Sequence, residues 1–126
     1  MKKFLILLAL LVGLIVWFRD WVSTGRMDNF IRQHKHTDFT PKILYLLSQF
    51  HTFSQNPKYA SYYYRWFIED YPTHIKIPEM RWQLGRSYEE MNQRNLALEQ
   101  YTVLKDSYTN TEQGRLAMNR YGRLRY

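Results

Sequence analysis

The sequence contains no cysteine. Disulfide scaffolds, thiol nucleophiles, thiolate zinc sites and covalently attached c-type haem are therefore excluded. A chain without cysteine fits an oxidising compartment, but many cytosolic proteins lack cysteine too. This absence alone does not fix the location.

The short motifs that carry chemistry are also missing. The sequence shows no Ser/His/Asp order, no Gly-rich phosphate loop and no zinc-ligand spacing. Two pairs of adjacent carboxylates occur, Glu69-Asp70 and Glu89-Glu90. Neighbouring residues on a helix point about 100° apart, so we predict solvated helix faces and not paired acid and base groups. We therefore predict a protein that is not an enzyme, with no catalytic residues, no metal and no cofactor.

The four histidines do not form a metal-ligand pattern. His34 and His36 lie two residues apart with Asp38 as the nearest acid, which favours a solvated loop over a metal site. His51 falls at a position that we predict to be in the core, where a hydrogen-bonded histidine is expected. His74 follows a proline in a predicted loop and has no evident partner.

What the sequence does contain is a large share of apolar and aromatic side chains. Of its 126 residues 45% are hydrophobic and 17% are Phe, Trp or Tyr, which is too rich for a disordered segment. This length leaves room for one domain and a tether. Eighteen basic and eleven acidic residues give a net charge of +7, which invites an acidic protein, an anionic lipid surface or nucleic acid as a partner.

The tether is an apolar run near the N-terminus. Lys2 and Lys3 precede fifteen residues without a polar side chain, from Phe4 to Phe18. As a helix this run covers roughly 22 Å, short of a hydrocarbon core of about 30 Å. Trp17 and Trp21 flank its end, where aromatic rings sit at the headgroup level.

We predict that residues 1–22 form an uncleaved signal-anchor, a single transmembrane helix that contacts the bilayer through residues 4–18. The alternative is a signal peptide cleaved near Ser23-Thr24-Gly25, but Arg19, Asp20 and Trp21 suit a signal peptidase poorly. The N-terminal lysines favour a cytoplasmic N-terminus, which would place the C-terminal domain in the periplasm at a bacterial inner membrane. Basic residues on the other flank of the run oppose this orientation.

Residues 23–40 form a polar connector without a sustained hydrophobic period, and the chain changes character at 41. From there the sequence repeats with a period of 37 residues, which signals stacked supersecondary units. Matching pairs at this spacing are Leu47 and Leu84, Ser48 and Gly85, Ala60 and Ala97, Tyr64 and Tyr101, Phe67 and Leu104, and Tyr71 and Tyr108. The apolar spacing is helical and polar turns interrupt it, which predicts helices over 41–54, 57–71, 77–92, 94–108 and 111–125.

These motifs resemble the tetratricopeptide repeat (TPR). Leu84-Gly85-x-x-Tyr88 followed by Ala97-x-x-x-Tyr101-x-x-Leu104 is similar to the signature of that family, and residues 47–72 repeat it with His51 in the aromatic position. The period resembles bacterial envelope TPR proteins of the outer-membrane assembly lipoprotein and Tol-Pal coordination type. Three features depart from the pattern: the early Trp is replaced by Leu44 and Arg81, the first unit has Ser48 in place of the Gly, and the third unit ends after its first helix. The lipid-accepting cysteine of the envelope lipoproteins is also absent.

The resemblance implies an all-α fold, a short TPR-like α-solenoid over 41–126 with two helical hairpins and a capping helix. In such repeats Gly85 or Ser48 would lie where the two helices of a hairpin come closest. The inner helices line a concave groove, which implies six partner-binding positions. They are Tyr45, Gln49, Trp82, Arg86, Asn119 and Arg123.

Three further aromatic residues, Tyr62, Tyr63 and Trp66, lie off the buried stripe of their predicted helix, and we predict a second binding surface there. The alternative is that they pack against residues 19–40 or against the next hairpin.

Together these features predict a membrane-anchored TPR scaffold, a small accessory subunit of a larger membrane protein complex. A transient envelope assembly or secretion adaptor that binds peptide segments is the first alternative. A cytoplasmic nucleic-acid-binding module is the second, suggested by basic and aromatic residues between Arg115 and Tyr126. Expected partners are protein subunits and the lipid bilayer, with neither nucleic acid nor a small-molecule substrate.

Overall fold

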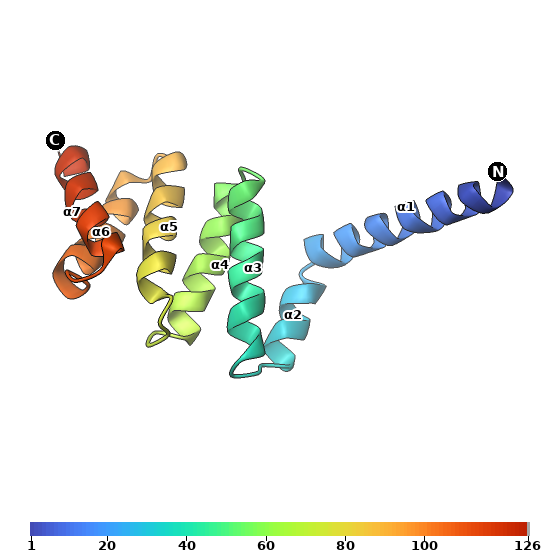
Figure 1. Cartoon of the computed structure of the whole chain (residues 1–126), viewed down its shortest axis with the longest axis horizontal. Coiled ribbons are helices and arrows are strands. Elements are labelled where there is room, and N and C mark those ends of the chain that lie inside the picture. The colour runs from blue at the N-terminus through green and yellow to red at the C-terminus, as the bar shows by residue number, and fades with distance from the viewer. Residues whose placement is uncertain (126) are drawn as a thin grey trace. The chain divides into compact units, whose positions relative to one another are not determined.

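The computed structural model describes residues 1–125, and over that range the chain forms helices and no strand (Figure 1). The prediction of an all-α fold is confirmed. The seven helices of this range are α1 (Lys2–Ser23), α2 (Arg26–Gln33), α3 (Phe39–Phe53), α4 (Pro57–Asp70), α5 (Ile77–Glu90), α6 (Arg94–Ser107) and α7 (Glu112–Arg125). They fall into two compact units, Met1–Thr40 and the chain from Pro41 onward.

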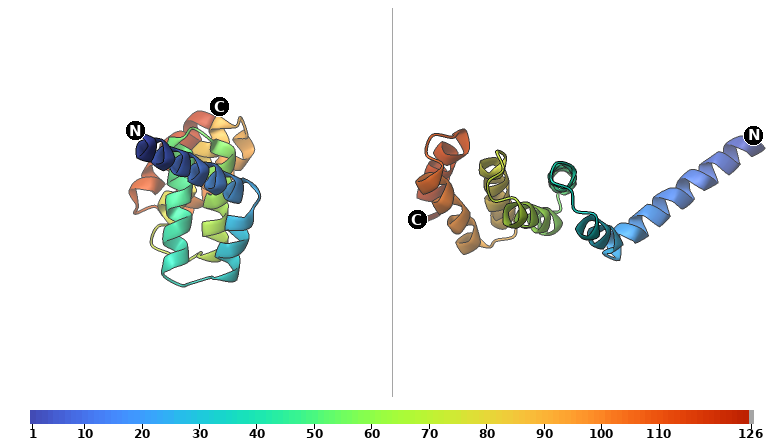
Figure 2. Two further views of the ribbon diagram at one scale, coloured as in Figure 1. Left: turned by 90° about the vertical axis from the view of Figure 1, so that its right-hand side faces the viewer. Right: turned by 90° about the horizontal axis from the view of Figure 1, so that it is seen from below.

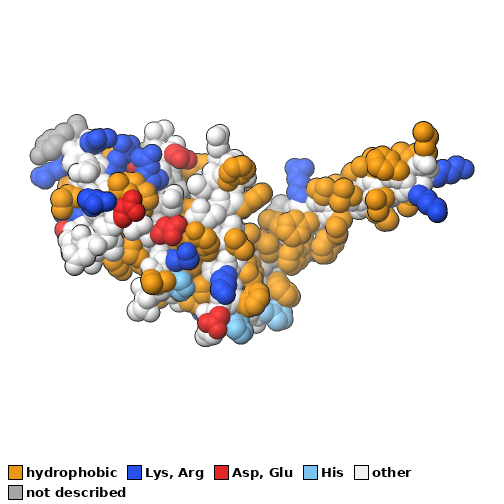
Figure 3. Space-filling view, in the orientation of Figure 1, with side chains coloured by type: hydrophobic (Ala, Val, Ile, Leu, Met, Phe, Trp, Pro, Cys, Tyr) orange, Lys and Arg blue, Asp and Glu red, His pale blue; other side chains and the backbone are white. Residues whose placement is uncertain are grey.

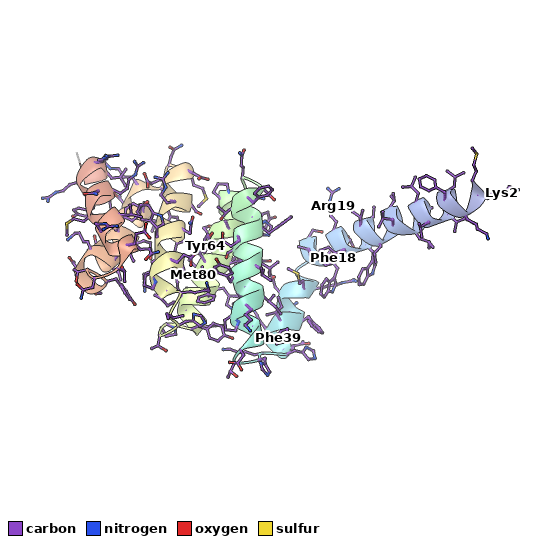
Figure 4. All side chains as sticks on the ribbon, in the orientation of Figure 1. Lys2, Phe18, Arg19, Phe39, Tyr64 and Met80 are labelled. Atoms are coloured by element: carbon purple, nitrogen blue, oxygen red, sulfur yellow. The ribbon has the colours of Figure 1, made fainter. Side chains whose placement is uncertain are left out.

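Helix α1 is long and apolar enough to cross a membrane. It does not end with the apolar run but continues through Arg19 to Ser23 (Figure 4). Its 22 residues span roughly 33 Å, which matches a hydrocarbon core of about 30 Å. The rings of Trp17 and Trp21 stack along one side of its C-terminal end at 6.0 Å. None of its residues is buried, and only Trp21 and Val22, at its C-terminal end, are half-buried.

Helix α2 lies within the polar connector, where the sequence analysis predicted no helix. Gly25 precedes it in the left-handed region with φ 75°, which a glycine adopts without strain. Asp28 lies in the first turn and Arg32 in the last, so each charge interacts favourably with the helix dipole. The helix has only eight residues, and its two buried side chains, Met27 and Ile31, are too few to produce a visible hydrophobic period.

The five helices predicted after Pro41 are confirmed as α3 to α7, with ends within a few residues of the predicted ones. Helices α4, α5, α6 and α7 pack each against the next, and the right-hand view of Figure 2 shows the successive hairpins side by side.

The backbone itself repeats with the period of the sequence. Gln55 and Asn92, 37 residues apart, both have left-handed φ angles, of 56° and 58°. In each turn the next amide bonds back to the preceding helix: Asn56 N–H to the His51 carbonyl at 2.9 Å, and Gln93 N–H to the Tyr88 carbonyl at 2.8 Å. Helices commonly end with such a left-handed residue, because the amide groups that follow can then hydrogen-bond to carbonyls of the last turn. The chain changes direction at the same point.

The repeated apolar pairs form the core of this unit. Ala60 and Ala97, Tyr64 and Tyr101, and Phe67 and Leu104 are all 0% exposed. Figure 4 labels Tyr64 and Met80, two of these fully buried side chains, which α4 and α5 contribute.

Gly85 makes room for a side chain from the other helix of the second hairpin. A Cβ atom at this position would lie 2.5 Å from Cε1 of the Tyr101 ring, which leaves no room for a side chain. Ser48, at the matching position of the first hairpin, is fully buried. Small residues at these two sites therefore let a buried tyrosine from the second helix of each hairpin lie against the first.

Candidate interaction site

The six predicted groove residues lie in three helices of the repeat unit, two each in α3, α5 and α7. They form two sets at the 37-residue period: Tyr45, Trp82 and Asn119 in one, and Gln49, Arg86 and Arg123 in the other. The four in α3 and α5 are half-buried and the two in α7 are exposed. All six therefore keep some surface for a partner.

Trp82 and Arg86 share one side of α5, one turn apart. The guanidinium carbon of Arg86 lies 6.0 Å from the centre of the Trp82 ring, within the range of a cation–π contact. Arg86 also pairs with Glu89 across 3.3 Å. The Trp82 ring touches the buried Tyr101 ring at 5.3 Å between centroids, so one part of the indole supports the core and the rest stays accessible.

Tyr45 is engaged within the protein. Its hydroxyl donates to Glu79 Oε1 at 3.2 Å, and Lys76 Nζ lies 4.3 Å from the centre of its ring. Burial raises the pKa of the Tyr45 hydroxyl above its ordinary value, and the Glu79 carboxylate raises it further. Tyr45 therefore ties α3 to the first turn of α5. The side-chain nitrogen of Gln49, one turn further along α3, is buried without a hydrogen-bond partner.

Glu89 is not on a solvated face, and that prediction is wrong. Its side chain is only 11% exposed. It accepts hydrogen bonds from Arg120 Nε at 2.8 Å, from Arg120 Nη2, and from the Tyr101 hydroxyl. Burial raises the pKa of the Glu89 carboxyl, but the hydrogen bonds from Arg120 and Tyr101 outweigh it and hold that pKa below its ordinary value. Glu90, the other member of the pair, is exposed as predicted.

The Glu89 cluster joins three helices, because Glu89, Tyr101 and Arg120 come from α5, α6 and α7. The sequence analysis missed it, since Glu89 and Arg120 are 31 residues apart and follow no helical or repeat spacing. The only available signal was helical spacing within α5. Glu89 comes one turn after Gly85, on the helix side that carries Leu84, Gly85 and Tyr88.

The second predicted surface is wrong for two of its three residues. Tyr63 and Trp66 are 3% and 4% exposed, and only Tyr62 is half-buried. Tyr63 stacks on His51 at 5.4 Å, and the Trp66 indole N–H donates to Asp70 Oδ2 at 2.8 Å. Helix α4 buries residues around much of its circumference. The narrow stripe of Ala60, Tyr64 and Phe67 used for the prediction therefore included too few of its buried residues. Such a broad apolar surface was visible in the run of aromatic residues near the middle of α4.

No known family model matches the chain, and no curated protein sequence matches it either. An assignment of function must therefore start from the geometry of the described residues.

Among residues 1–125, no group of three or more His, Asp or Glu side chains could hold a metal ion. His36 Nδ1 accepts the amide N–H groups of Asp38 and Phe39 at 3.2 Å, at the start of α3. His34 Nδ1 lies 3.0 Å from the Phe30 carbonyl. These two histidines, both exposed, serve local backbone contacts.

Several basic residues near the C-terminus are also engaged within the protein. Arg120 is held by Glu89, and Lys105 Nζ lies 5.0 Å from the centre of the Tyr121 ring. Tyr126, part of the basic and aromatic set considered for nucleic acid, lies outside the described residues.

Proposed function

We propose that this protein is a non-catalytic, membrane-anchored TPR-like scaffold and a small accessory subunit of a larger membrane protein complex. Helix α1 would hold it in a bacterial inner membrane, with the repeat unit on the periplasmic side. The helices from Pro41 onward would contact a soluble part of another subunit.

The observation that carries this proposal is the Trp82–Arg86 pair on α5. Tryptophan and arginine are the residues that most often dominate the energy of protein interfaces. Arg86 keeps 42% of its side chain exposed although it already contacts Trp82 and Glu89. The pair is thus positioned by the fold and still accessible, which suits a preorganised contact with another protein.

The exposed apolar run of α1 supports the membrane part of the proposal. From Phe4 to Phe18 every residue is exposed, and such a surface is covered either by lipid or by other transmembrane helices. Two hairpins and a capping helix offer little groove for autonomous peptide capture, which favours a resident subunit over a transient adaptor.

Purification of the full chain from native membranes in mild detergent tests the proposal. A stoichiometric set of membrane subunits that stays bound supports the accessory-subunit role. Heterogeneous, substoichiometric segments would indicate an adaptor instead, and nuclease-sensitive material would indicate the nucleic-acid alternative.

The contact itself is tested by Trp82→Ala and Arg86→Ala. We expect Trp82→Ala to cost about 2 kcal/mol or more of partner affinity, roughly thirtyfold in Kd. Arg86→Ala should weaken binding as well, whereas Arg94→Ala, an equal loss of charge at an exposed site on α6, should leave it unchanged. The measurement is the partner retained on the purified chain.

Trp82 also touches Tyr101, so near-UV circular dichroism must show that the variant is folded. If folded Trp82→Ala and Arg86→Ala retain their partners as Arg94→Ala does, the α5 surface is not the contact.

A further inference from the structure

The turn that joins α3 and α4 carries exposed aromatic rings. Phe50 is 61% exposed, Phe53 is 89% exposed and Tyr59 is 52% exposed. Lys58, next to Tyr59, is exposed too. We call Phe50, Phe53, Lys58 and Tyr59 the aromatic tip. Figure 3 shows hydrophobic side chains gathered near this end of α3.

Phe50 and Tyr59 each contact the half-buried His51 ring at 5.4 Å between ring centroids, yet all three aromatic side chains of the tip stay more than half exposed. The second hairpin makes the same turn, with Asn92 in the left-handed conformation of Gln55, but with different residues around it. At the period of 37, Phe53 corresponds to Glu90 and Phe50 to Ser87. Both Phe53 and Glu90 are exposed, so one hairpin presents an aromatic ring to its surroundings where the other presents a carboxylate. Because both positions are exposed, packing of the core does not explain why one hairpin has Phe53 where the other has Glu90.

The charge around the tip indicates what covers it. Lys58 is the one charged residue from Phe50 to Tyr59, and no Asp or Glu occurs in the thirty residues from Phe39 to Ile68. Aromatic rings and basic side chains together match the headgroup region of a bilayer that contains anionic lipid. A second copy of the same face would bring like charges together, which disfavours self-association.

We propose that the aromatic tip docks into the headgroup layer of an anionic lipid bilayer. Phe50 and Phe53 enter the boundary between headgroups and acyl chains, while Lys58 and Tyr59 contact lipid phosphates. This inference rests on the proposed anchor: α1 would tether the repeat unit to the same bilayer, and a tether raises the effective concentration of the tip at the lipid surface, so even a weak contact becomes occupied. It assigns the first hairpin to lipid and leaves the α5 surface to protein.

The cysteine-free sequence allows a direct test on the full chain. Ser54→Cys places one thiol beside Phe53, at an exposed site, and keeps every residue of the tip. The thiol is labelled with a polarity-sensitive nitrobenzoxadiazole dye, and the chain is reconstituted into phosphatidylcholine vesicles with or without phosphatidylglycerol. Glu90→Cys, labelled in the same way, reports the tip of the second hairpin.

We expect the Ser54→Cys dye to shift to shorter emission wavelength and to be quenched by spin-labelled lipids, more so with phosphatidylglycerol. The Glu90→Cys dye should keep its emission in water. Adding Phe50→Ser and Phe53→Glu, the residues of the second hairpin, should abolish both the shift and the quenching. A water-like Ser54→Cys signal in both vesicle types overturns the inference.

Flotation of the vesicles separates this inference from the proposed function. If the chain floats with the vesicles but its tip dye stays water-like, the anchor is supported and the lipid contact of the tip is contradicted. If the chain does not float, both the anchor and the lipid contact are contradicted. Two observations together would show that a second copy covers the tip and would overturn the lipid assignment: disulfide-linked pairs of unlabelled Ser54→Cys chains, and a shifted signal of the labelled chain that spin-labelled lipid does not quench.

Discussion

At Gly114 the first turn of α7 passes directly against the end of α6. A Cβ atom there would lie 1.9 Å from the Tyr108 carbonyl oxygen, and 3.1 Å from the Leu104 carbonyl oxygen. The Gly114 amide also donates to Thr111 Oγ1 at 3.0 Å, so Thr111 caps the N-terminus of α7. Both obstacles are backbone atoms, which cannot turn aside as a flexible side chain could.

We therefore expect Gly114→Ala to destabilise the repeat unit by about 1–3 kcal/mol, because α7 must move away from α6. Gly122→Ala is the matched control in the same helix, since nothing lies within 4 Å of its Cβ position. It should stabilise by up to about 1 kcal/mol through helix propensity. Urea unfolding followed by near-UV circular dichroism measures both; changes of the same sign would contradict the packing of α7 described above.

At the scale of the helices, α7 is held to the second hairpin by a polar cluster in addition to apolar contacts. Glu89 of α5 accepts hydrogen bonds from Arg120 of α7 and Tyr101 of α6. Burial raises the pKa of the Tyr101 hydroxyl, and the hydrogen bond to Glu89 raises it further, so this hydroxyl stays protonated and donating. Removal of one member of such a cluster leaves the others partly buried without a partner.

Acid should weaken this cluster. The folded-state pKa of Glu89 lies below the ordinary value of 4.5, so the stability that Glu89 contributes is present above pH 4.5 and is lost as the pH falls below it. Glu89→Gln should cost roughly 1–3 kcal/mol at pH 7. The difference from the unmodified protein should shrink below about pH 4.5.

Denaturant unfolding at several pH values measures this effect. Glu90→Gln is the control, an identical change at the exposed neighbouring carboxylate, and it should alter stability by less than about 0.5 kcal/mol. An equal penalty for Glu89→Gln at neutral and acidic pH would show that ionisation of Glu89 does not stabilise α7.

At the scale of the molecule, the chain combines an apolar helix with a compact repeat unit. We expect the mature protein to keep Met1–Phe18 and to resist carbonate extraction from membranes, because α1 is long enough to span and its C-terminal flank suits a signal peptidase poorly. Mass spectrometry of the purified protein would map the N-terminus. A mature N-terminus at or near Arg26 would contradict the anchor.

A substitution in α1 tests the anchor, and a conservative change at the same position is its control. Leu10→Asp places a carboxylate near the middle of α1, at a cost of roughly 3 kcal/mol for membrane insertion. This variant should move into the carbonate-soluble fraction, while Leu10→Ile should stay with the membranes.

The sequence by itself determined the local features of this protein. The turns at Gln55 and Asn92, the small residues at Ser48 and Gly85, and the buried tyrosines recur at a period of 37, and the helices formed where that period predicted them. Such features depend on residues a few positions apart, which is why a linear pattern reveals them.

Only the tertiary structure decided which side chains of those helices are buried or paired. Tyr63 and Trp66 seemed to face outward and are buried, while Glu89 seemed solvated and is bound by Arg120, 31 residues away. The eight residues of α2 became helical although their sequence shows no sustained period. Helical spacing identified the centre of each buried stripe, but the width of the stripe and the pairing of Glu89 depend on what the remaining chain brings to each surface.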